Sequence, residues 1–144
     1  MFSSRFVSWI GLSLALLPWH AMAATCASTS NDPAQVVNAQ FAAYNAHDVE
    51  AFAACYADDV SIISLDGKRP PIKGIPALKK TYAFLNKEPA SFRVEIIKRM
   101  VNGPIVVDIE RVHGLPPGKS LPDMIAMYEV RNGKVLNAWF PPPE

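Results

Sequence analysis

Two carboxylates, Asp108 and Glu110, have the residue types and spacing best suited to acid–base chemistry. They alternate with apolar residues in the segment 105–112. Because successive side chains of a strand point to opposite faces, a strand here would place both carboxylates on one face. If that face lines an apolar pocket, burial and mutual repulsion would raise the pKa of at least one of them. A group that transfers protons near neutral pH needs such a shift.

An ion-pair network is the structural alternative for the same two carboxylates. A tight turn at Asn102-Gly103 would bring Lys98 and Arg99 close to them, and Arg111 is adjacent in sequence. The sequence does not show whether the two acids face a pocket or the outer surface of a sheet. Both interpretations therefore stay open.

Aromatic residues give the second indication of a binding site. They come from both helical and strand-like segments, so they could converge on a flat apolar ligand. The residues are Phe41, Tyr44, Phe52, Tyr56, Tyr82, Tyr128 and Trp139. Tyr44 and Tyr128 are favoured for the pocket because a phenol between helix and sheet can orient a carbonyl group. The alternative is that most of these rings are ordinary core.

Composition excludes several classes of protein. The chain has 144 residues with 14 basic and 13 acidic side chains, which fits one domain without a basic surface for nucleic acid. Two cysteines and the separate histidines His47 and His113 do not have metal-ligand spacing. No glycine-rich phosphate loop is present either. We therefore expect neither a metal nor another cofactor.

The first 23 residues have the pattern of a secretory signal peptide. Arg5 supplies a positive charge, residues 6–17 are almost wholly apolar, and Ala21-Met22-Ala23 fits signal peptidase. We predict cleavage between Ala23 and Ala24 and a periplasmic or secreted protein that has no further contact with the membrane. A retained membrane anchor is the alternative.

Both cysteines, Cys26 and Cys55, would remain in the exported chain and meet an oxidising compartment. This favours one disulfide between them. The alternative is a buried free thiol at Cys55 in an apolar segment.

The periodicity of apolar residues predicts an α+β domain. Helical spacing indicates helices at 33–46, 48–56 and about 75–85, with a strand at 60–65 before the third. A period of two then predicts strands at 92–101, 105–113, 124–131 and 134–140. This order gives helices on one side of an antiparallel sheet. Residues 24–32 form a lead segment, 33–140 the domain, and 141–144 a proline-rich tail.

Several short motifs follow one another in an order that is typical of a known family. They are Tyr44–Asp48, Phe52, Tyr56–Val60, Gly74, Tyr128–Val135 and Ala138–Phe140. The chain resembles the SnoaL-like branch of the nuclear-transport-factor-2-like (NTF2-like) superfamily over about residues 33–140. The resemblance implies a cone, in which three N-terminal helices and one short strand between them pack on a strongly curved antiparallel sheet. It also implies a mostly apolar pocket and, in many members, a homodimer.

Ketosteroid isomerases belong to this superfamily, and their three functional positions can be compared directly with this sequence. The two oxyanion-hole positions fall on Gln40 and about Ala126, and the position of the base falls on Ser64. Glutamine can donate a hydrogen bond, but alanine cannot and serine is no base. We therefore predict that the protein is not a ketosteroid isomerase. Asp66 could replace Ser64 only if the strand continued past it.

Two functional hypotheses remain, since members of the superfamily include both enzymes and binding modules. One is a cofactor-independent isomerase, cyclase or lyase for a small apolar or aromatic molecule; the other is a non-catalytic module that binds a ligand or protein. A periplasmic inhibitor is a third, weaker alternative. The candidate catalytic residues are Asp108 and Glu110. The candidate pocket residues are Gln40, Phe41, Tyr44, Tyr56, Ser64, Tyr82, Ala126, Tyr128 and Trp139. The substrate stays open.

Overall fold

The computed structural model describes residue 26 and residues 30–142. The predicted signal peptide and its cleavage site between Ala23 and Ala24 lie outside the described residues, as does the end of the proline-rich tail. Within the described part, no helix has the length and hydrophobicity needed to cross a membrane.

The three predicted helices are present. They are α1 (Pro33–Asn45), α2 (Val49–Ala53) and α3 (Gly74–Tyr82), and a 3₁₀ turn, η1 (Ala83–Lys87), follows α3. Asp32 and Asp48 start the first two helices, because each side chain accepts a hydrogen bond from a free backbone N–H group of the first turn. The second helix ends earlier than predicted, since residue 56 already belongs to a strand.

One six-stranded sheet carries the rest of the fold. Its strands are β1 (Tyr56–Ser64), β2 (Ile72–Lys73), β3 (Arg93–Asn102), β4 (Ile105–His113), β5 (Met124–Arg131) and β6 (Lys134–Phe140). The order across the sheet is β2-β1-β6-β5-β4-β3. The predicted antiparallel meander is confirmed for β3 to β6, but β1 pairs with β6 in parallel, so the sheet is mixed. The strand β2 was not predicted, and β1 begins at residue 56 rather than at the predicted residue 60. Asp58 and Asp59, interpreted as a helix end, are exposed strand residues.

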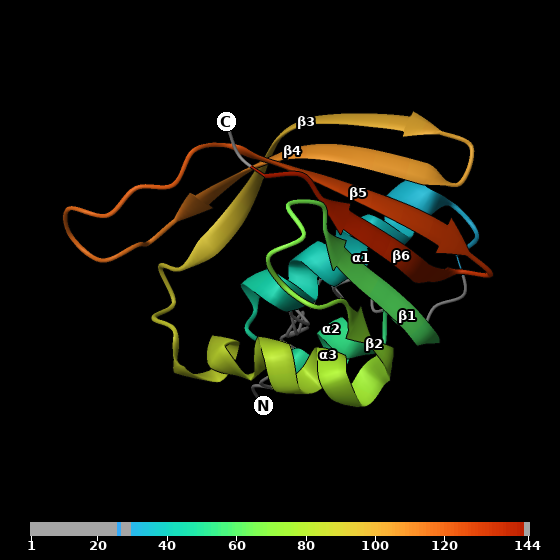
Figure 1. Cartoon of the computed structure of the whole chain (residues 1–144), viewed down its shortest axis with the longest axis horizontal. Helices are drawn as coiled ribbons and strands as arrows, with labels where there is room; N and C mark the ends of the chain where they lie inside the picture. Colours follow the sequence, from blue (N-terminus) through green and yellow to red (C-terminus); the bar gives the residue numbers. More distant parts are fainter. Residues whose placement is uncertain (1–25, 27–29, 143–144) are drawn as a thin grey trace, which may run out of the picture.

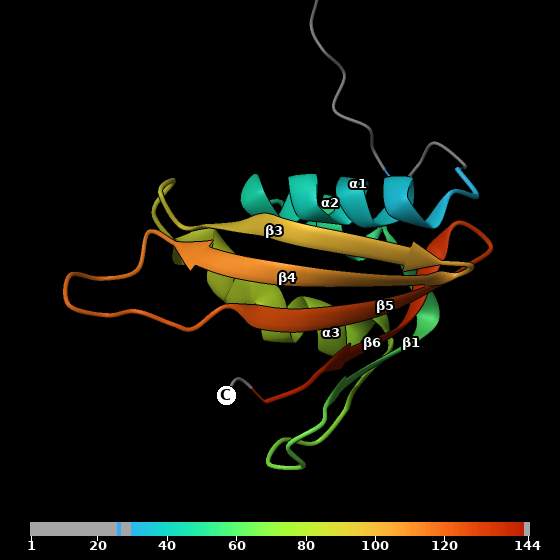
Figure 2. The ribbon, with the colours of Figure 1, turned by 90° about the horizontal axis from the view of Figure 1, so that it is seen from above.

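The helices cover one face of the curved sheet (Figure 1). Seen from above, the long strands β3 to β5 extend across the molecule beside α1 and over α3 (Figure 2). This is the predicted α+β cone, with helices on its inner side. We call the helix-covered side of the sheet the inner face and the other side the outer face.

Strand register decides which side chains reach the inner face. Tyr128 lies opposite Val106 on one neighbouring strand and Ala138 on the other, and these three side chains are buried. Residues paired across neighbouring strands share a face. The adjacent row, which contains Met127 and Trp139, is therefore on the outer face.

A β-bulge in β3 controls how that strand meets the helices. Ile96 pairs with Glu110, but the next inward pair is Arg99 with Asp108, so β3 has one residue more than β4 over this stretch. The extra residue turns Arg99 inward, where its Nη1 lies 3.4 Å from the carbonyl oxygen of Ala34 in α1. Bulges bend a strand and increase its twist. This bulge therefore contributes to the curvature of the cone.

A disulfide joins Cys26 to Cys55, with the two Cα atoms 4.9 Å apart. Cys55 is fully buried between α2 and β1. The bond holds the segment before α1 against the start of the sheet.

Candidate functional site

Glu110 is the centre of the candidate site. It lies on the inner face of β4 and is only 5% exposed. The Tyr128 hydroxyl donates a 2.8 Å hydrogen bond to its Oε1 atom. Burial raises the pKa of Glu110 from 4.5 to about 7, and the charge of Asp108 adds to the increase, while the Tyr128 hydrogen bond and Arg99 oppose it. Near neutral pH this carboxyl group can therefore either donate or accept a proton.

The two oxygens of Glu110 have different environments. Oε1 is held by Tyr128, whereas Oε2 has no hydrogen-bond partner among the described residues. In that same part of the chain, every buried side-chain nitrogen or oxygen has a partner. Oε2 is therefore left to accept a proton or a hydrogen bond.

Gln40 in α1 supplies a second polar group on the inner side. It is 3% exposed, and its Oε1 accepts a 3.1 Å hydrogen bond from the Tyr56 hydroxyl. This bond fixes the amide so that its two N–H groups stay available as donors. Neither donates to a described residue, so they can polarise a carbonyl group of a ligand.

A cluster of tyrosines lies close to Glu110. Tyr44 and Tyr82 meet edge to face with their ring centres 6.2 Å apart, and Phe52 joins Tyr82 to Tyr56. Burial raises the pKa of Tyr82 to about 12, with the charge of Glu110 adding to it, and raises the pKa of the other phenols as well. At neutral pH these hydroxyls are protonated. They can donate hydrogen bonds but cannot act as bases.

Asp108 has a different role from Glu110, although it lies on the same face. It is fully buried, and Arg99 binds both of its carboxylate oxygens at 2.6 Å. Arg99 also donates to Asn38 Oδ1 at 2.5 Å, which links the ion pair to α1. Asp108 therefore fits the structural alternative, while Glu110 fits the buried acid. Asn38 was not predicted as a partner of this ion pair, because only the packing of α1 on the sheet brings it close to Arg99.

The outer parts of the predicted ion-pair network form elsewhere. Arg111 is exposed and binds Asp123 through two 2.8 Å hydrogen bonds. Lys98 pairs in register with Ile109 and makes no ion pair with a described carboxylate. Of the basic residues predicted to pair with Asp108, only Arg99 does so.

The other predicted pocket residues lie in three different places. Phe41 and Ala126 are buried in the core, and Ser64 lies at the end of β1, where its hydroxyl donates to Asp66 at 2.8 Å. The placement of Trp139 in the pocket was wrong. Trp139 pairs with Met127 and therefore lies on the outer face, opposite to Tyr128.

Phe140 occupies the inner position that was assigned to its neighbour. Its ring meets that of Tyr128 edge to face at 6.3 Å. The signal was available in the sequence: once Tyr128 and Ala138 are paired, alternation places residue 140 on the same face as residue 138.

Residues 37–138 match the SnoaL-like domain family. The chain belongs to this family. No protein with a curated function matches the sequence significantly.

Solved structures share the fold of this SnoaL-like domain at low sequence identity. An uncharacterised cystatin-fold protein of Novosphingobium aromaticivorans is 23% identical, with a TM-score of 0.65 over 77% of this chain and 98% of the other. A candidate polyketide cyclase of Sinorhizobium meliloti is 20% identical, with a TM-score of 0.61 over 73% and 92%. A protein of Catenulispora acidiphila with a ketosteroid-isomerase-like fold, solved with trimethylamine, is 18% identical, with a TM-score of 0.60 over 73% and 82%. These similarities establish the fold.

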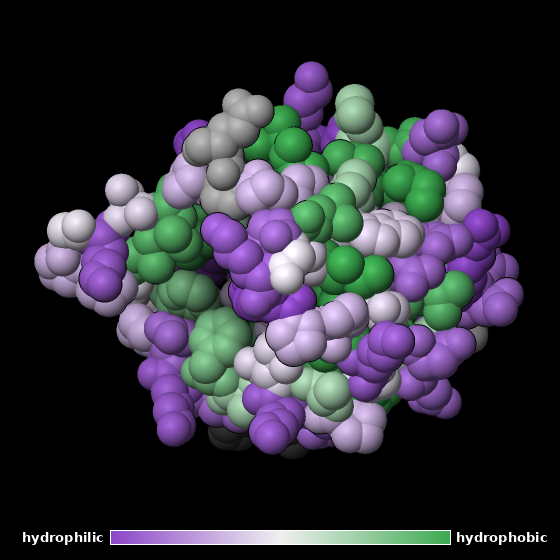
Figure 3. All heavy atoms as spheres, viewed as in Figure 1, coloured by the Kyte–Doolittle hydropathy of each residue, from purple (hydrophilic) through white to green (hydrophobic). Residues whose placement is uncertain are grey.

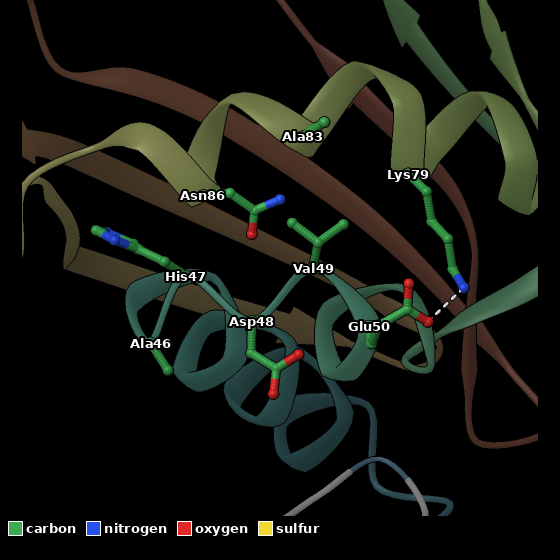
Figure 4. Close-up of a pocket in the computed structure, with 8 residues that line it drawn as sticks. All are labelled: Ala46, His47, Asp48, Val49, Glu50, Lys79, Ala83 and Asn86. Atoms are coloured by element: carbon green, nitrogen blue, oxygen red, sulfur yellow. Dashed lines mark hydrogen bonds and ion pairs between the residues drawn. The ribbon is translucent and has the colours of Figure 1, made fainter.

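The SnoaL-like domain also has an open groove of about 560 Å³ on the helical side. It lies between α2 and the helices α3 and η1, and an ion pair between Lys79 and Glu50 closes one end (Figure 4). Its lining residues are Ala46, His47, Asp48, Val49, Glu50, Lys79, Ala83 and Asn86. None of them was predicted for the pocket, and Glu110 is not among them. The groove is therefore separate from the candidate site.

Proposed function

We propose that this SnoaL-like domain binds a small apolar organic molecule inside its cone and moves a proton on it, as a cofactor-independent isomerase, cyclase or lyase. Glu110 is the observation that carries the proposal. It is a nearly buried acid on the inner face of the sheet, with a pKa of about 7 and one oxygen that has no hydrogen-bond partner among the described residues. Such a group can be protonated or ionised with similar ease at neutral pH.

The proposed chemistry uses the two oxygens of Glu110 for different purposes. Oε2 removes a proton from a carbon next to a carbonyl group, and the bonding electrons move onto the carbonyl oxygen. Gln40 donates N–H to that oxygen as it becomes negative. Tyr128 holds Oε1 and fixes the orientation of the carboxylate. Return of the proton to another carbon of a conjugated enolate completes an isomerisation. In a cyclisation, the enolate carbon instead attacks a second carbonyl group, and the alkoxide formed there takes the proton back from Glu110.

The name of one structural neighbour agrees with this class of reaction. The Sinorhizobium meliloti protein is described as a candidate polyketide cyclase. A carbon–carbon cyclisation of this kind begins with the same proton removal. The agreement supports the reaction class but not a substrate.

Exchange of carbon-bound protons tests the proposal without knowledge of the substrate. The protein is incubated with 2-tetralone in D2O, and proton NMR follows loss of the signals next to the carbonyl group. We expect catalysed exchange by the native protein and loss of most of it in Glu110→Gln. Glu95→Gln, which removes an exposed carboxylate on β3, is the matched control and should exchange like the native protein. Equal exchange rates in Glu110→Gln and native protein would contradict the role of Glu110.

We also propose that the protein is exported to the periplasm or secreted. The signal-peptide pattern of residues 1–23 supports export, and the disulfide between Cys26 and Cys55 needs an oxidising compartment. Fractionation of bacterial cells that express the full chain tests this, with mass spectrometry of the N-terminus. A mature chain that starts at Ala24 and contains no free thiol is expected. Retention of the whole chain in the cytoplasm would overturn the proposal.

A non-catalytic binding module is the second candidate function. The commitment of Asp108 to Arg99 favours it, because only one of the two predicted acids is left for chemistry. Native mass spectrometry of the exported, unrefolded protein distinguishes the candidates. A retained organic ligand that the protein does not alter would favour the binding module, and a ligand that turns over would favour the enzyme.

A homodimer through the outer face is part of the proposal. Apolar side chains form a row there across five strands: Met100, Val107, Met127, Trp139 and Ile63, each paired in register with the next. Met100 is 59% exposed, which is unfavourable for a large apolar side chain. A second copy of the chain would cover the row. Light scattering should show a dimer that Met100→Lys weakens, and a monomer at high concentration would contradict it.

A further inference from the structure

The loop between β1 and β2 places a positive charge beside the end of the inner face. Arg69 in this loop is exposed, and its Nη2 atom lies 3.4 Å from the hydroxyl oxygen of Ser64. The surface in Figure 3 is hollowed to the left of centre, between polar side chains over this loop and hydrophobic ones over η1 and the β4–β5 connection. The loop that carries Arg69 therefore borders a recess in the surface.

Arg69 makes no ion pair within the described residues, although its charge contributes to lowering the pKa of Asp66 in the same loop, after the hydrogen bonds of Asp66 to Lys68 and Ser64. Arg99, Arg111 and Arg131 each bind a carboxylate at 2.6–2.8 Å. Asp66, the acid in the same loop, instead uses one oxygen to accept hydrogen bonds from the Ser64 hydroxyl and the Lys68 backbone. The contact between Arg69 and Ser64 is long for a hydrogen bond, so a better acceptor can replace it.

A continuous set of contacts leads from Ser64 to Glu110. Ser64 pairs with Phe140 on β6, and the ring of Phe140 meets that of Tyr128, which donates to Glu110. The charge of Arg69 also lowers the pKa of Tyr82, which burial otherwise raises, so the guanidinium acts on the tyrosine cluster as well. Arg69 thus lies at one end of the candidate site and Glu110 within it.

We infer that Arg69 binds the anionic group of the ligand, and that the ligand is a small aromatic or alicyclic carboxylate whose apolar body extends toward Glu110. This inference rests on the proposed function, because it names the substrate class of the same site. A guanidinium group can bind both oxygens of a carboxylate through parallel N–H groups. The charged end would stay at the wet rim while the apolar end is desolvated among the rings.

The orientation follows from charge. A carboxylate placed beside Glu110 would oppose ionisation of that residue, so the anion and the reacting carbon must be at opposite ends of the ligand. Arg69 lies at the surface, where binding of an anion costs little desolvation. The site would therefore select by charge at the rim and by shape inside.

A matched pair of probes tests the inference. Isothermal titration calorimetry at pH 7 measures binding of 2-naphthoate and of neutral 2-naphthamide, with naphthalene-2-sulfonate as a third arm. We expect the native protein to bind naphthoate about tenfold more tightly than the amide, the difference expected for a charge-assisted hydrogen-bond pair. Arg69→Gln should reduce the preference to less than about twofold. Lys68→Gln, which removes a neighbouring charge from the same loop, should keep it.

Each other outcome counts against the inference. Equal affinity for naphthoate and naphthamide in the native protein, no measurable binding of either probe, or an unchanged preference in Arg69→Gln would overturn it. Sulfonate binding as tight as that of naphthoate would overturn the choice of a carboxylate and leave only anion recognition. Glu110→Gln separates this test from that of the proposed function, because it should lose proton exchange but keep the preference for naphthoate.

Discussion

Tyr128 on β5 and Glu110 on β4 are joined by a 2.8 Å hydrogen bond although they are not opposite each other in the sheet. The cross-strand partner of Glu110 is Met124, and Ala126 lies between Met124 and Tyr128 on the inner face of β5. Because Ala126 has only a methyl group, the long tyrosine side chain has room to reach past it on the curved inner face. The bond therefore depends on a small residue between the two partners.

The stability of the protein should depend on the protonation of Glu110. Its pKa is about 7 in the folded protein and 4.5 ordinarily, so the folded state binds the proton more tightly. The stabilisation is complete below pH 4.5 and is lost as the pH rises through 7, a loss of about 3 kcal/mol from this group. Urea unfolding from pH 4 to 8 measures it. Glu110→Gln should gain stability relative to the native protein over this range, and a constant difference between the two would contradict the shift.

Replacement of Asp108 by Asn should destabilise the protein rather than only reduce activity. Arg99 is mostly buried, and without its partner the guanidinium group would remain uncompensated, at a cost of about 3 kcal/mol. Chemical unfolding of Asp108→Asn measures the loss. Asp123→Asn breaks an exposed ion pair of the same chemistry on Arg111 and should have little effect. If the Asp108→Asn variant were fully stable but inactive, Asp108 would be a catalytic residue and not a structural one.

Reduction of the disulfide should lower stability. Cys26 and Cys55 close a loop with a sequence separation of 29, and loss of such a crosslink costs about 3.6 kcal/mol in a chain-entropy account. Thermal unfolding with and without dithiothreitol measures the difference. The double variant Cys26→Ala, Cys55→Ala is the control and should not respond to the reductant. An equal response in that variant would show that reduction acts by another route.

Gly114, at the end of β4, should not tolerate a side chain. Its φ is +74°, and a Cβ atom would lie 2.2 Å from the backbone oxygen of Ser91. Gly118 has a similar φ of +78° but open space around it. Gly114→Ala should therefore lower the free energy of unfolding by more than about 2 kcal/mol, and Gly118→Ala by about 1 kcal/mol. Equal losses in the two variants would exclude the close contact as the cause.

Much of the fold was predictable from local patterns. Aspartates at helix starts, period-two segments and Asn-Gly turns define the helices and the meander. The parallel pairing of β1 with β6 was not predictable in this way, because it joins segments more than 70 residues apart and leaves no local signal. The short strand β2 was also hidden, since a two-residue strand cannot show alternation.

The candidate site was only partly predictable, for reasons of register. Alternation placed Asp108 and Glu110 on one face, but their separate roles depend on whether Arg99 or Tyr128 reaches each carboxylate. Both contacts depend on cross-strand geometry. Arg69 gave no signal, because a loop arginine beside prolines is usually solvated, and only the position of the loop relates it to Ser64.

The bulge in β3 means that deletion of one residue would change the shape of the strand but not which side chains point inward. Ile97 is the extra residue and is 41% exposed. Without it, the alternation of β3 would be regular, and Ile96 and Arg99 would still point inward. The side chains of the site would be retained, but the bend would be lost. The bend of β3 therefore depends on the extra residue Ile97, whereas the contacts of the site depend on its neighbours. Deletion of Ile97 would flatten the cone and leave all the contact-forming side chains in the sequence.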